Sequence, residues 1–353
     1  MDQQPIGPVS QLLFWPAVIG TYRSDDAIQL DDKIARALIA TRPLQRLAGI
    51  GFLGAIDYVR HGTGRSPHRR RHNRLEHSLG VANLADLYAR SAELPENRRV
   101  LLVAAALLHD VGHGPLSHTL EPVFDAEFSI NHHSMTRRIV TGASPLGQEI
   151  RDLLLCAGID IDEVLALIEG KHDGDVGFLF SGQINLDTLD GITRSRAFMA
   201  RRTAPCSARS IVHKWAIETH LPLAEFDAFW KLKHDVYNLF IGAPRGAALD
   251  AIAQAYMRSA LTEFSPDDFF LTERTFRKLH PGLFDCLNQG KGPLAGLRDR
   301  LPRAWLNQDV SIKSRSFFVC RDAVPEQHSM NKRYQQTKRV FTKKLGEVIE
   351  ASS

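Results

Sequence analysis

An apolar run that ends in a histidine and an aspartate most constrains how this chain can fold. The run VLLVAAALL is followed at once by His109 and Asp110, and then by the glycine-rich stretch VGHGPLSH. A helix that is apolar on all sides is buried at the centre of a fold. A charge buried behind it costs several kcal/mol unless it is paired or bound to a metal. We therefore expect a central helix over 96–112 with a metal-binding site at its C-terminal end.

Apolar residues recur with the helical period along most of the chain, which predicts an all-α fold class in which helices pack on helices. Helices are expected over 30–41, 74–94, 96–112, 132–141, 145–157, 161–169, 186–200, 207–219, 223–240 and 245–262. Past Ser311 the composition changes, because RSFFVC is strand-like and KRYQQTKRVFTKK is a basic, weakly amphipathic tail. We predict an N-terminal extension over 1–29, a helical catalytic core over 30–265, and a small mixed α/β C-terminal appendage with a basic tail over 266–353.

The composition is that of an ordinary soluble protein. Apolar residues are 44%, charged residues 24%, and the net charge of +4 is small for 353 residues, so neither nucleic acid nor a membrane is required as a partner. The 4 cysteines are far apart and form no CxxC pair, which argues against a disulfide scaffold and a zinc knuckle. The apolar stretch LLFWPAVIG is short and contains a proline, which is not typical of a signal peptide. We expect a cytoplasmic protein.

Histidine is over-represented, with 15 in the chain, and we expect His109 and Asp110 to bind one ion together with two residues from other helices. His77 is the natural first partner, because Gly80 and Val81 place it on a face that packs inward, and Asp187 is the natural fourth. Two imidazoles and two carboxylates suit one divalent metal ion, namely Mn, Fe, Ni, Zn, Co or Mg. The dipeptide alone is weak evidence, since it recurs at His172-Asp173 in a loop and at His234-Asp235 in an ordinary amphipathic helix.

These motifs together resemble the HD-domain metal-dependent phosphohydrolases, most closely the deoxynucleoside triphosphate triphosphohydrolase branch. The resemblance runs from about Leu30 to about Leu261. HNRLEHSLGV is similar to the family's first-histidine motif, LLHDVGHGPLSH to its HD motif, and INLDTLDGITR more loosely to its last-aspartate motif. The resemblance implies a helical HD-domain fold, the same four metal ligands, and attack of a metal-activated water on phosphorus.

The resemblance also implies roles for residues around the metal. His113 would face the substrate phosphates, and His118 with Glu121 would form an oriented proton donor on one helical face. His132 would be a further catalytic histidine, with His133 as the alternative if the register differs by one. The implied substrate contacts are Arg74 on phosphate, together with Leu53, Asp190 and Arg194.

The chain departs from the dNTP-hydrolysing pattern where that pattern recognises the sugar. The pattern DKxDYxxRD is here DTLDGITRS, so Thr188, Gly191 and Ser195 replace three contact groups, and Phe52 stands where a glutamine would read the sugar. A pocket that lacks the polar groups that hydrogen-bond the sugar discriminates less strongly between substrates that differ in the sugar.

We predict a metal-dependent phosphohydrolase of (deoxy)nucleoside triphosphates or related nucleotides. The alternatives are a phosphohydrolase of another phosphorylated metabolite, a di-iron oxygenase, and a non-catalytic nucleotide- or nucleic-acid-binding protein. The last would use Arg65, the arginines at 69–71 and the basic tail for weak nucleic-acid contact. A homo-oligomer is a further expectation from the family.

Overall fold

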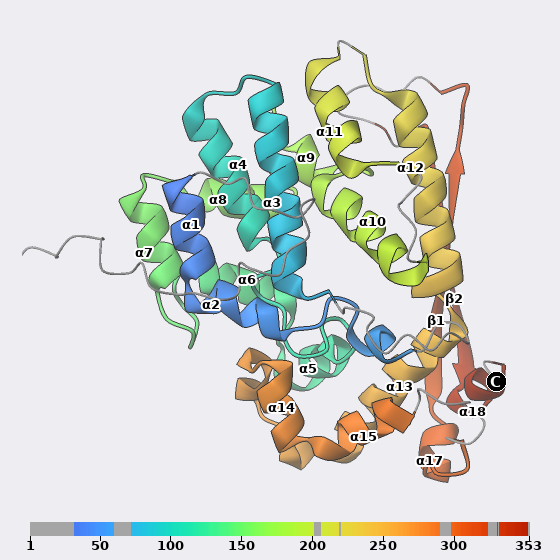
Figure 1. Cartoon of the computed structure of the whole chain (residues 1–353). Coiled ribbons are helices and arrows are strands. Elements are labelled where there is room, and N and C mark those ends of the chain that lie inside the picture. The colour runs from blue at the N-terminus through green and yellow to red at the C-terminus, as the bar shows by residue number, and fades with distance from the viewer. Residues whose placement is uncertain are drawn as a thin grey trace, which may run out of the picture.

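A computed structural model describes residues 32–59, 72–200, 206–218, 220–289, 298–323, 330 and 332–351. Most of these residues are helical and one two-stranded sheet lies near the C-terminus, which confirms an all-α fold with a small mixed C-terminal part (Figure 1). The first helices are α1 (Lys33–Ala40), α2 (Arg42–Arg46), α3 (Arg74–Ser91), α4 (Glu96–Leu108), α5 (Glu121–Phe128), α6 (His132–Val140), α7 (Glu149–Cys156), α8 (Ile161–Ile168) and α9 (Phe178–Ser181).

The later elements complete the helical body and add the sheet. They are α10 (Leu186–Ala200), α11 (Ala208–Ile217), α12 (Leu223–Val236), α13 (Pro244–Ser259), α14 (Glu273–Leu279), α15 (Pro281–Gln289), α17 (Arg303–Leu306), β1 (Asp309–Val319), β2 (Tyr334–Lys344) and α18 (Leu345–Glu350). Short turns of other helix types are η3 (Leu47–Gly49), η4 (Gly54–Tyr58), η5 (Tyr237–Ile241), η6 (Leu261–Glu263) and η7 (Pro266–Phe270).

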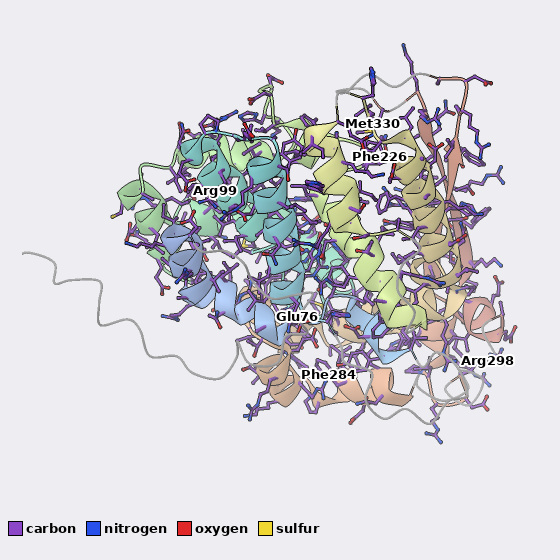
Figure 2. The ribbon with its side chains drawn as sticks, turned by 45° about the horizontal axis from the view of Figure 1, so that its top comes forward. Glu76, Arg99, Phe226, Phe284, Arg298 and Met330 are labelled. Atoms are coloured by element: carbon purple, nitrogen blue, oxygen red, sulfur yellow. The ribbon has the colours of Figure 1, made fainter. Side chains whose placement is uncertain are left out.

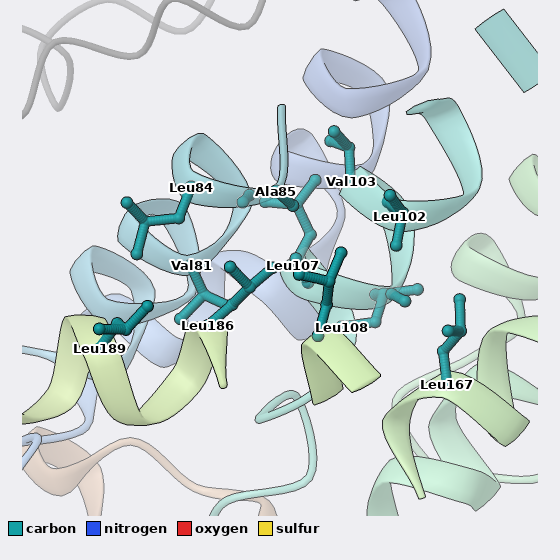
Figure 3. Close-up of a cluster of buried hydrophobic side chains, with 14 of the residues drawn as sticks. Val81, Leu84, Ala85, Leu102, Val103, Leu107, Leu108, Leu167, Leu186 and Leu189 are labelled. Atoms are coloured by element: carbon teal, nitrogen blue, oxygen red, sulfur yellow. The ribbon is translucent and has the colours of Figure 1, made fainter. Parts of the chain in front are cut away.

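Helices α3 and α4 pack side by side at the centre of the fold (Figure 1). Asn73 begins α3, because its side chain accepts a hydrogen bond from the backbone N–H of Glu76 at 2.8 Å. Leu107 and Leu108 at the end of α4 lie among Val81 of α3 and Leu186 of α10 (Figure 3). The apolar run therefore forms the contact that fixes three helices around the end of α4.

The central helix ends four residues earlier than the sequence predicts. We expected it to extend to Gly112, but α4 stops at Leu108 and the chain turns, with the N–H of Val111 donating to the carbonyl of Leu108 at 3.1 Å. Gly112 lies so close to α6 that a Cβ there would sit 2.2 Å from the carbonyl oxygen of His132. This close approach forces the turn, and it places His109 and Asp110 at the helix end.

The other predicted helices are present with shifted ends. The helix expected from residue 145 begins at Glu149, and the one expected to reach residue 240 leaves the α form after Val236 and continues as one turn of π-helix. Helix α5 was not predicted as a separate element. Sequence analysis placed His118 and Glu121 on one helical face, but His118 lies in the turn before α5, which begins at Glu121.

The basic segment 332–344, for which the sequence predicts no strand, is mostly strand β2, paired antiparallel with β1. Only Tyr334 of β2 is buried, so the strand lacks the apolar alternation that would reveal it. The ribbon is fixed to α12 by Trp230, whose indole N–H donates to the carbonyls of Phe318 at 3.1 Å and Gln335 at 3.3 Å. Contact with α12 therefore stabilises β2 as a strand although its sequence is mostly polar.

Two apolar clusters fill the interior. The first surrounds α3, α4, α10 and α12, and the second combines α5, α13, α15 and α18. Phe226 and Met330 of the first cluster lie at the opposite end of the molecule from Phe284 of the second (Figure 2). The second cluster takes residues from both sides of position 265. The domain boundaries at 29 and 265 stay predictions.

Two predicted segments lie outside the described residues, namely the extension over 1–29 and the arginine-rich loop that contains Arg65 and 69–71. Within the described part of the chain, none of the helices combines the length and the hydropathy that a membrane span needs.

Substituting Trp230 tests the attachment of the ribbon. Trp230→Phe removes the donor that serves both strands, and we expect the free energy of unfolding in urea to fall by about 1–3 kcal/mol more than in the control. The control is Trp215→Phe, since Trp215 is equally buried and its indole N–H has no hydrogen-bond partner among the described residues. Equal losses in the two variants would contradict the role given to Trp230.

Candidate metal centre

Three side chains from three parts of the fold, His77, His109 and Asp187, hold ligand-type atoms within 4.8 Å of one another, and Asp110 lies beside the two imidazoles. His77 Nε2 lies 3.0 Å from Asp187 Oδ1 and 3.3 Å from His109 Nε2. Asp110 Oδ2 lies 3.6 Å from His77 Nε2 and 3.5 Å from His109 Nε2. Atoms bound about 2.1 Å from one ion lie roughly 3.0–3.4 Å apart, so these separations fit a shared ion after small movements.

The other nitrogen of each imidazole is held by an acceptor. His109 Nδ1 lies 2.8 Å from the carbonyl oxygen of Ala106, one turn back in α4. His77 Nδ1 lies 2.7 Å from Asp190 Oδ2, and Asp190 in turn accepts two hydrogen bonds from Arg194, at 2.8 Å and 2.9 Å. Such partners fix the ring orientation of metal-binding histidines and leave Nε2 free for the ion.

His77 is the most strongly perturbed histidine of this set. It is 1% exposed and lies between Asp187 and Asp190. Burial alone would lower the pKa of His77, but its hydrogen bonds to the two carboxylates and their charges outweigh burial and raise the pKa to about 9. Without a metal ion the imidazole therefore carries a proton at neutral pH, and binding an ion displaces that proton.

Arg74 connects the metal-ligand set to the next turn of the chain. Its Nη1 donates to Asp110 Oδ2 at 2.6 Å and its Nε donates to Ser117 Oγ at 3.0 Å. Burial alone would raise the pKa of Asp110, but the charges of His109 and Arg74 and a hydrogen bond from His113 hold it well below its usual range. Asp110 is therefore ionised, as a metal ligand must be.

A second group lies beside the first and consists of His113, His118, Glu121 and His132, whose ligand-type atoms all lie within 4.8 Å of one another. Glu121 Oε2 lies 2.7 Å from His132 Nδ1 and 3.5 Å from His118 Nδ1. The rings of His113 and His132 are stacked at 4.3 Å and 8°. Lone pairs of parallel rings run in parallel planes, so these two nitrogens do not converge on an ion as those of His77 and His109 do.

A cavity of about 520 Å³ opens onto both groups, which is the size of a small-molecule site. Eight predicted site residues line it, namely Leu53, Arg74, His77, His109, Asp110, His118, His132 and Asp187. Four do not line it, namely His113, Glu121, Asp190 and Arg194. His133, the register alternative, also lines the cavity.

The residues that do not line the cavity support those that do. Asp190 and Arg194 were predicted as substrate contacts but lie behind His77. His113 was predicted to face phosphates, but it is fully buried against His118 and His132, and burial lowers its pKa well below the usual value. It is therefore a neutral imidazole that packs the site.

The turn that brings His118 to the cavity is strained. Leu116 and Ser117 have φ angles of 58° and 49°, in the left-handed region that costs such residues about 1–3 kcal/mol each. Ser117 Oγ donates to the carbonyl of Gly51 at 2.6 Å, and Glu273 accepts from the N–H of Leu116 at 3.3 Å. Sequence analysis did not find Glu273, because it comes from α14, far along the chain from the motifs.

Arg46 holds the adjoining turn from the other side. It is 8% exposed, and its Nη2 donates to the carbonyls of Val111 at 3.0 Å and His113 at 2.7 Å. Burial lowers the pKa of Arg46 to about 10, which still leaves it charged at neutral pH. The motifs quoted for the site in the sequence do not include Arg46.

The four departures from the dNTP-hydrolysing pattern, at Phe52, Thr188, Gly191 and Ser195, all line the cavity. The ring of Phe52 lies 4.7 Å from that of His77, and the guanidinium of Arg74 lies over it at 5.0 Å. A Cβ on Gly191 would meet Phe52 Cζ at 3.6 Å. Phe52 therefore provides an aromatic wall on the side that Gly191 leaves open.

Comparison with known proteins gives three kinds of relative. The HD domain family matches residues 74–214. The protein YwfO of Bacillus subtilis, uncharacterised, is 35% identical over 172 residues, which are 47% of this chain and 37% of YwfO. The deoxynucleoside triphosphate triphosphohydrolase SAMHD1 homolog of Dictyostelium discoideum is 24% identical over 265 residues, 70% of this chain and 48% of that protein.

Two solved structures share the fold over nearly their whole length. A hypothetical protein from Aquifex aeolicus has a TM-score of 0.60 at 17% identity, covering 91% of this chain and 95% of its own. A phosphohydrolase from Bacteroides thetaiotaomicron has a TM-score of 0.55 at 14% identity, covering 87% and 94%. By contrast, the chain spans less than half the length of the two curated relatives named above.

The proton on His77 makes metal binding depend on pH. Because a metal ion needs the neutral imidazole, we expect affinity to rise with pH up to about 9 and then to level off, with one proton released per ion below that pH. Calorimetric titration with Mn²⁺ in buffers of different ionisation enthalpy measures both quantities. Asp190→Asn should move the break to lower pH. An affinity that is constant from about pH 7 to 9 would contradict the assignment.

Two glycines beside His77 should respond in opposite ways to alanine. A Cβ on Gly80 would lie 2.1 Å from Asp190 Oδ1 and 2.6 Å from Arg194 Nη2, so Gly80→Ala should destabilise the fold by about 1–3 kcal/mol. Gly191 lies within α10 with only ordinary contacts, so Gly191→Ala should stabilise the fold by about 0.5–1 kcal/mol. Thermal unfolding of both variants checks this, and a destabilised Gly191→Ala variant would show that the site is packed otherwise.

Proposed function

We propose that this chain, whose residues 74–214 belong to the HD-domain family, is a metal-dependent phosphohydrolase. One observation carries the proposal: two imidazoles and the Asp187 carboxylate converge, with Asp110 beside the imidazoles, in a cavity that is also lined by Arg74 and His118. Mixed nitrogen and oxygen ligands with open positions are the donor set of hydrolytic divalent ions. One ion of Mn, Fe, Ni, Zn, Co or Mg would bind His77, His109, Asp110 and Asp187.

When bound, the ion supplies a polarised phosphoryl oxygen and an activated water. Arg74 lies beside Asp110 and at the cavity wall, where its guanidinium can stabilise the negative charge on the phosphate oxygens. His118 has Nδ1 directed at Glu121 and reaches the cavity, so it can protonate the leaving oxygen. His132, held by the same carboxylate, is the second candidate for that proton transfer.

Asp190 and Arg194 are assigned to positioning in this proposal. Asp190 holds His77 through Nδ1, and Arg194 neutralises Asp190 while also donating to the carbonyl of Glu76 at 3.0 Å. His113 supports His118 and His132 from behind. These residues act through the ligands and the proton donor.

Nucleotides are the proposed substrate class, with (deoxy)nucleoside triphosphates first. The support is that several curated relatives are named deoxynucleoside triphosphate triphosphohydrolases. The departures at Thr188, Gly191 and Ser195 lower the support for strict deoxyribose recognition, so a related phosphorylated metabolite is the second candidate. A cytoplasmic location and a homo-oligomer remain predictions, as does weak nucleic-acid contact.

The test is a hydrolysis screen with a matched control. Purified protein is assayed against dNTPs, NTPs, monophosphates and phosphosugars with Mn, Mg, Co, Ni and Zn. The double variant His109→Ala, Asp110→Ala should lose metal and at least about a thousandfold in rate, because the ion provides several kcal/mol of charge stabilisation. The control is His172→Ala, Asp173→Ala, the same dipeptide outside the cavity, which should keep the wild-type rate.

Two results would contradict the proposal. One is wild-type activity in the His109, Asp110 double variant. The other is metal-loaded protein that releases no phosphate species from any substrate while taking up oxygen with two irons per chain, which is the oxygenase alternative.

A further inference from the structure

Asp250 is a carboxylate in the same cavity that the proposed mechanism does not use. It lies on α13, and its Oδ1 accepts a hydrogen bond from Thr119 Oγ1 at 2.6 Å. The same hydroxyl oxygen accepts from the N–H of Ala55 at 2.9 Å, so the Thr119 side chain has its one proton committed to Asp250. Among the described residues, Asp250 Oδ2 has no hydrogen-bond donor.

No cation lies within ion-pair distance of Asp250 in the described part of the chain. Lys313 of β1 acts on it only through its charge from farther away. Burial raises the pKa of Asp250 to about 6, against the smaller opposite effects of Thr119 and Lys313. An acidic group that lines a cavity, with a raised pKa and one oxygen that has no hydrogen-bond donor, is a candidate for ligand recognition.

The rest of the cavity around Asp250 is largely apolar. Ile56, Ile241 and Tyr237 line it together with Leu53 and Ile192. The lining carboxylates besides Asp250 are Asp110 and Asp187, and both belong to the metal-ligand set. The metal ligands and Asp250 line the same cavity, so a substrate with its phosphoryl group on the ion has its other end in a cavity where Asp250 offers an acceptor.

We propose that Asp250 determines substrate specificity by accepting a hydrogen bond from an exocyclic amino group on the leaving part of the substrate, such as that of a cytosine or adenine base. The inference rests on the proposed phosphohydrolase function. A carboxylate only accepts hydrogen bonds, so it attracts an amino group and repels a carbonyl oxygen at the same position. A buried polar site discriminates strongly against a ligand that leaves it unpaired.

The experiment compares nucleotides that differ mainly in an amino or a carbonyl group. Cytidine and uridine phosphates form one pair, and adenosine and inosine phosphates form the other, so the pairs separate pyrimidine from purine recognition. In at least one pair, wild-type kcat/KM should favour the amino compound by roughly ten- to a hundredfold, the effect of one hydrogen bond to a charged group.

Asp250→Asn is the informative variant, because its amide oxygen can still accept from Thr119 while its NH₂ group becomes a donor toward the cavity. It should abolish or reverse the preference. The charge-matched control Asp285→Asn changes an exposed acid on α15 and should keep the wild-type preference. Hydrolysis of bis(p-nitrophenyl) phosphate, which has no amino group, should be equal in the wild-type protein and the Asp285→Asn control.

Equilibrium binding of the same nucleotide pairs to wild-type protein is the second measurement, and it needs neither turnover nor a folded variant. Tighter binding of an amino compound supports the inference even if no nucleotide is hydrolysed, in which case the proposed function alone fails. Equal binding and equal kcat/KM within both pairs would overturn it. A preference that Asp250→Asn retains unchanged would also overturn it.

Discussion

The imidazole of His77, buried between two carboxylates, is the interaction on which the rest of the site depends. Asp187 lies on its Nε2 side and Asp190 on its Nδ1 side, both from α10, while the ring itself comes from α3. His77 is 1% exposed whereas the Asp187 side chain is 57% exposed, and a buried charge such as that of the His77 imidazole is tolerated only when it is paired. The ion pair therefore fixes how α3 and α10 meet, and the end of α4 completes it with His109 and Asp110.

This arrangement explains why the apolar run and the polar cluster adjoin each other in the sequence. Leu107 and Leu108 hold the end of α4 among α3 and α10, so the next two residues must emerge where those helices converge (Figure 3). The turn that follows is held by Arg46, and the strained residues Leu116 and Ser117 are held by contacts to Gly51 and Glu273. Fixed backbone on both sides keeps His118 and Arg74 in place around the cavity.

The sequence was sufficient where the determinants are local or follow a motif. Helical periodicity predicted the main helices. The motifs predicted His77, His109 and Asp187, whose ligand-type atoms lie 3.0–3.9 Å from one another. It was insufficient where distant segments meet. Asp190 has the sequence position of a substrate contact but turns toward His77, and Glu273 and Asp250 enter the site from α14 and α13 without any motif. Strand β2 was missed because its partner surface is α12 and β1.

The proposed function depends on His77, His109, Asp110 and Asp187 binding one ion. Diffraction from metal-loaded crystals, recorded at the absorption edge of the bound metal, tests it most directly. We expect one anomalous peak about 2.0–2.2 Å from His77 Nε2, His109 Nε2 and one oxygen each of Asp110 and Asp187. A peak held instead by His113, His118, Glu121 and His132, or no peak at His77, would contradict it.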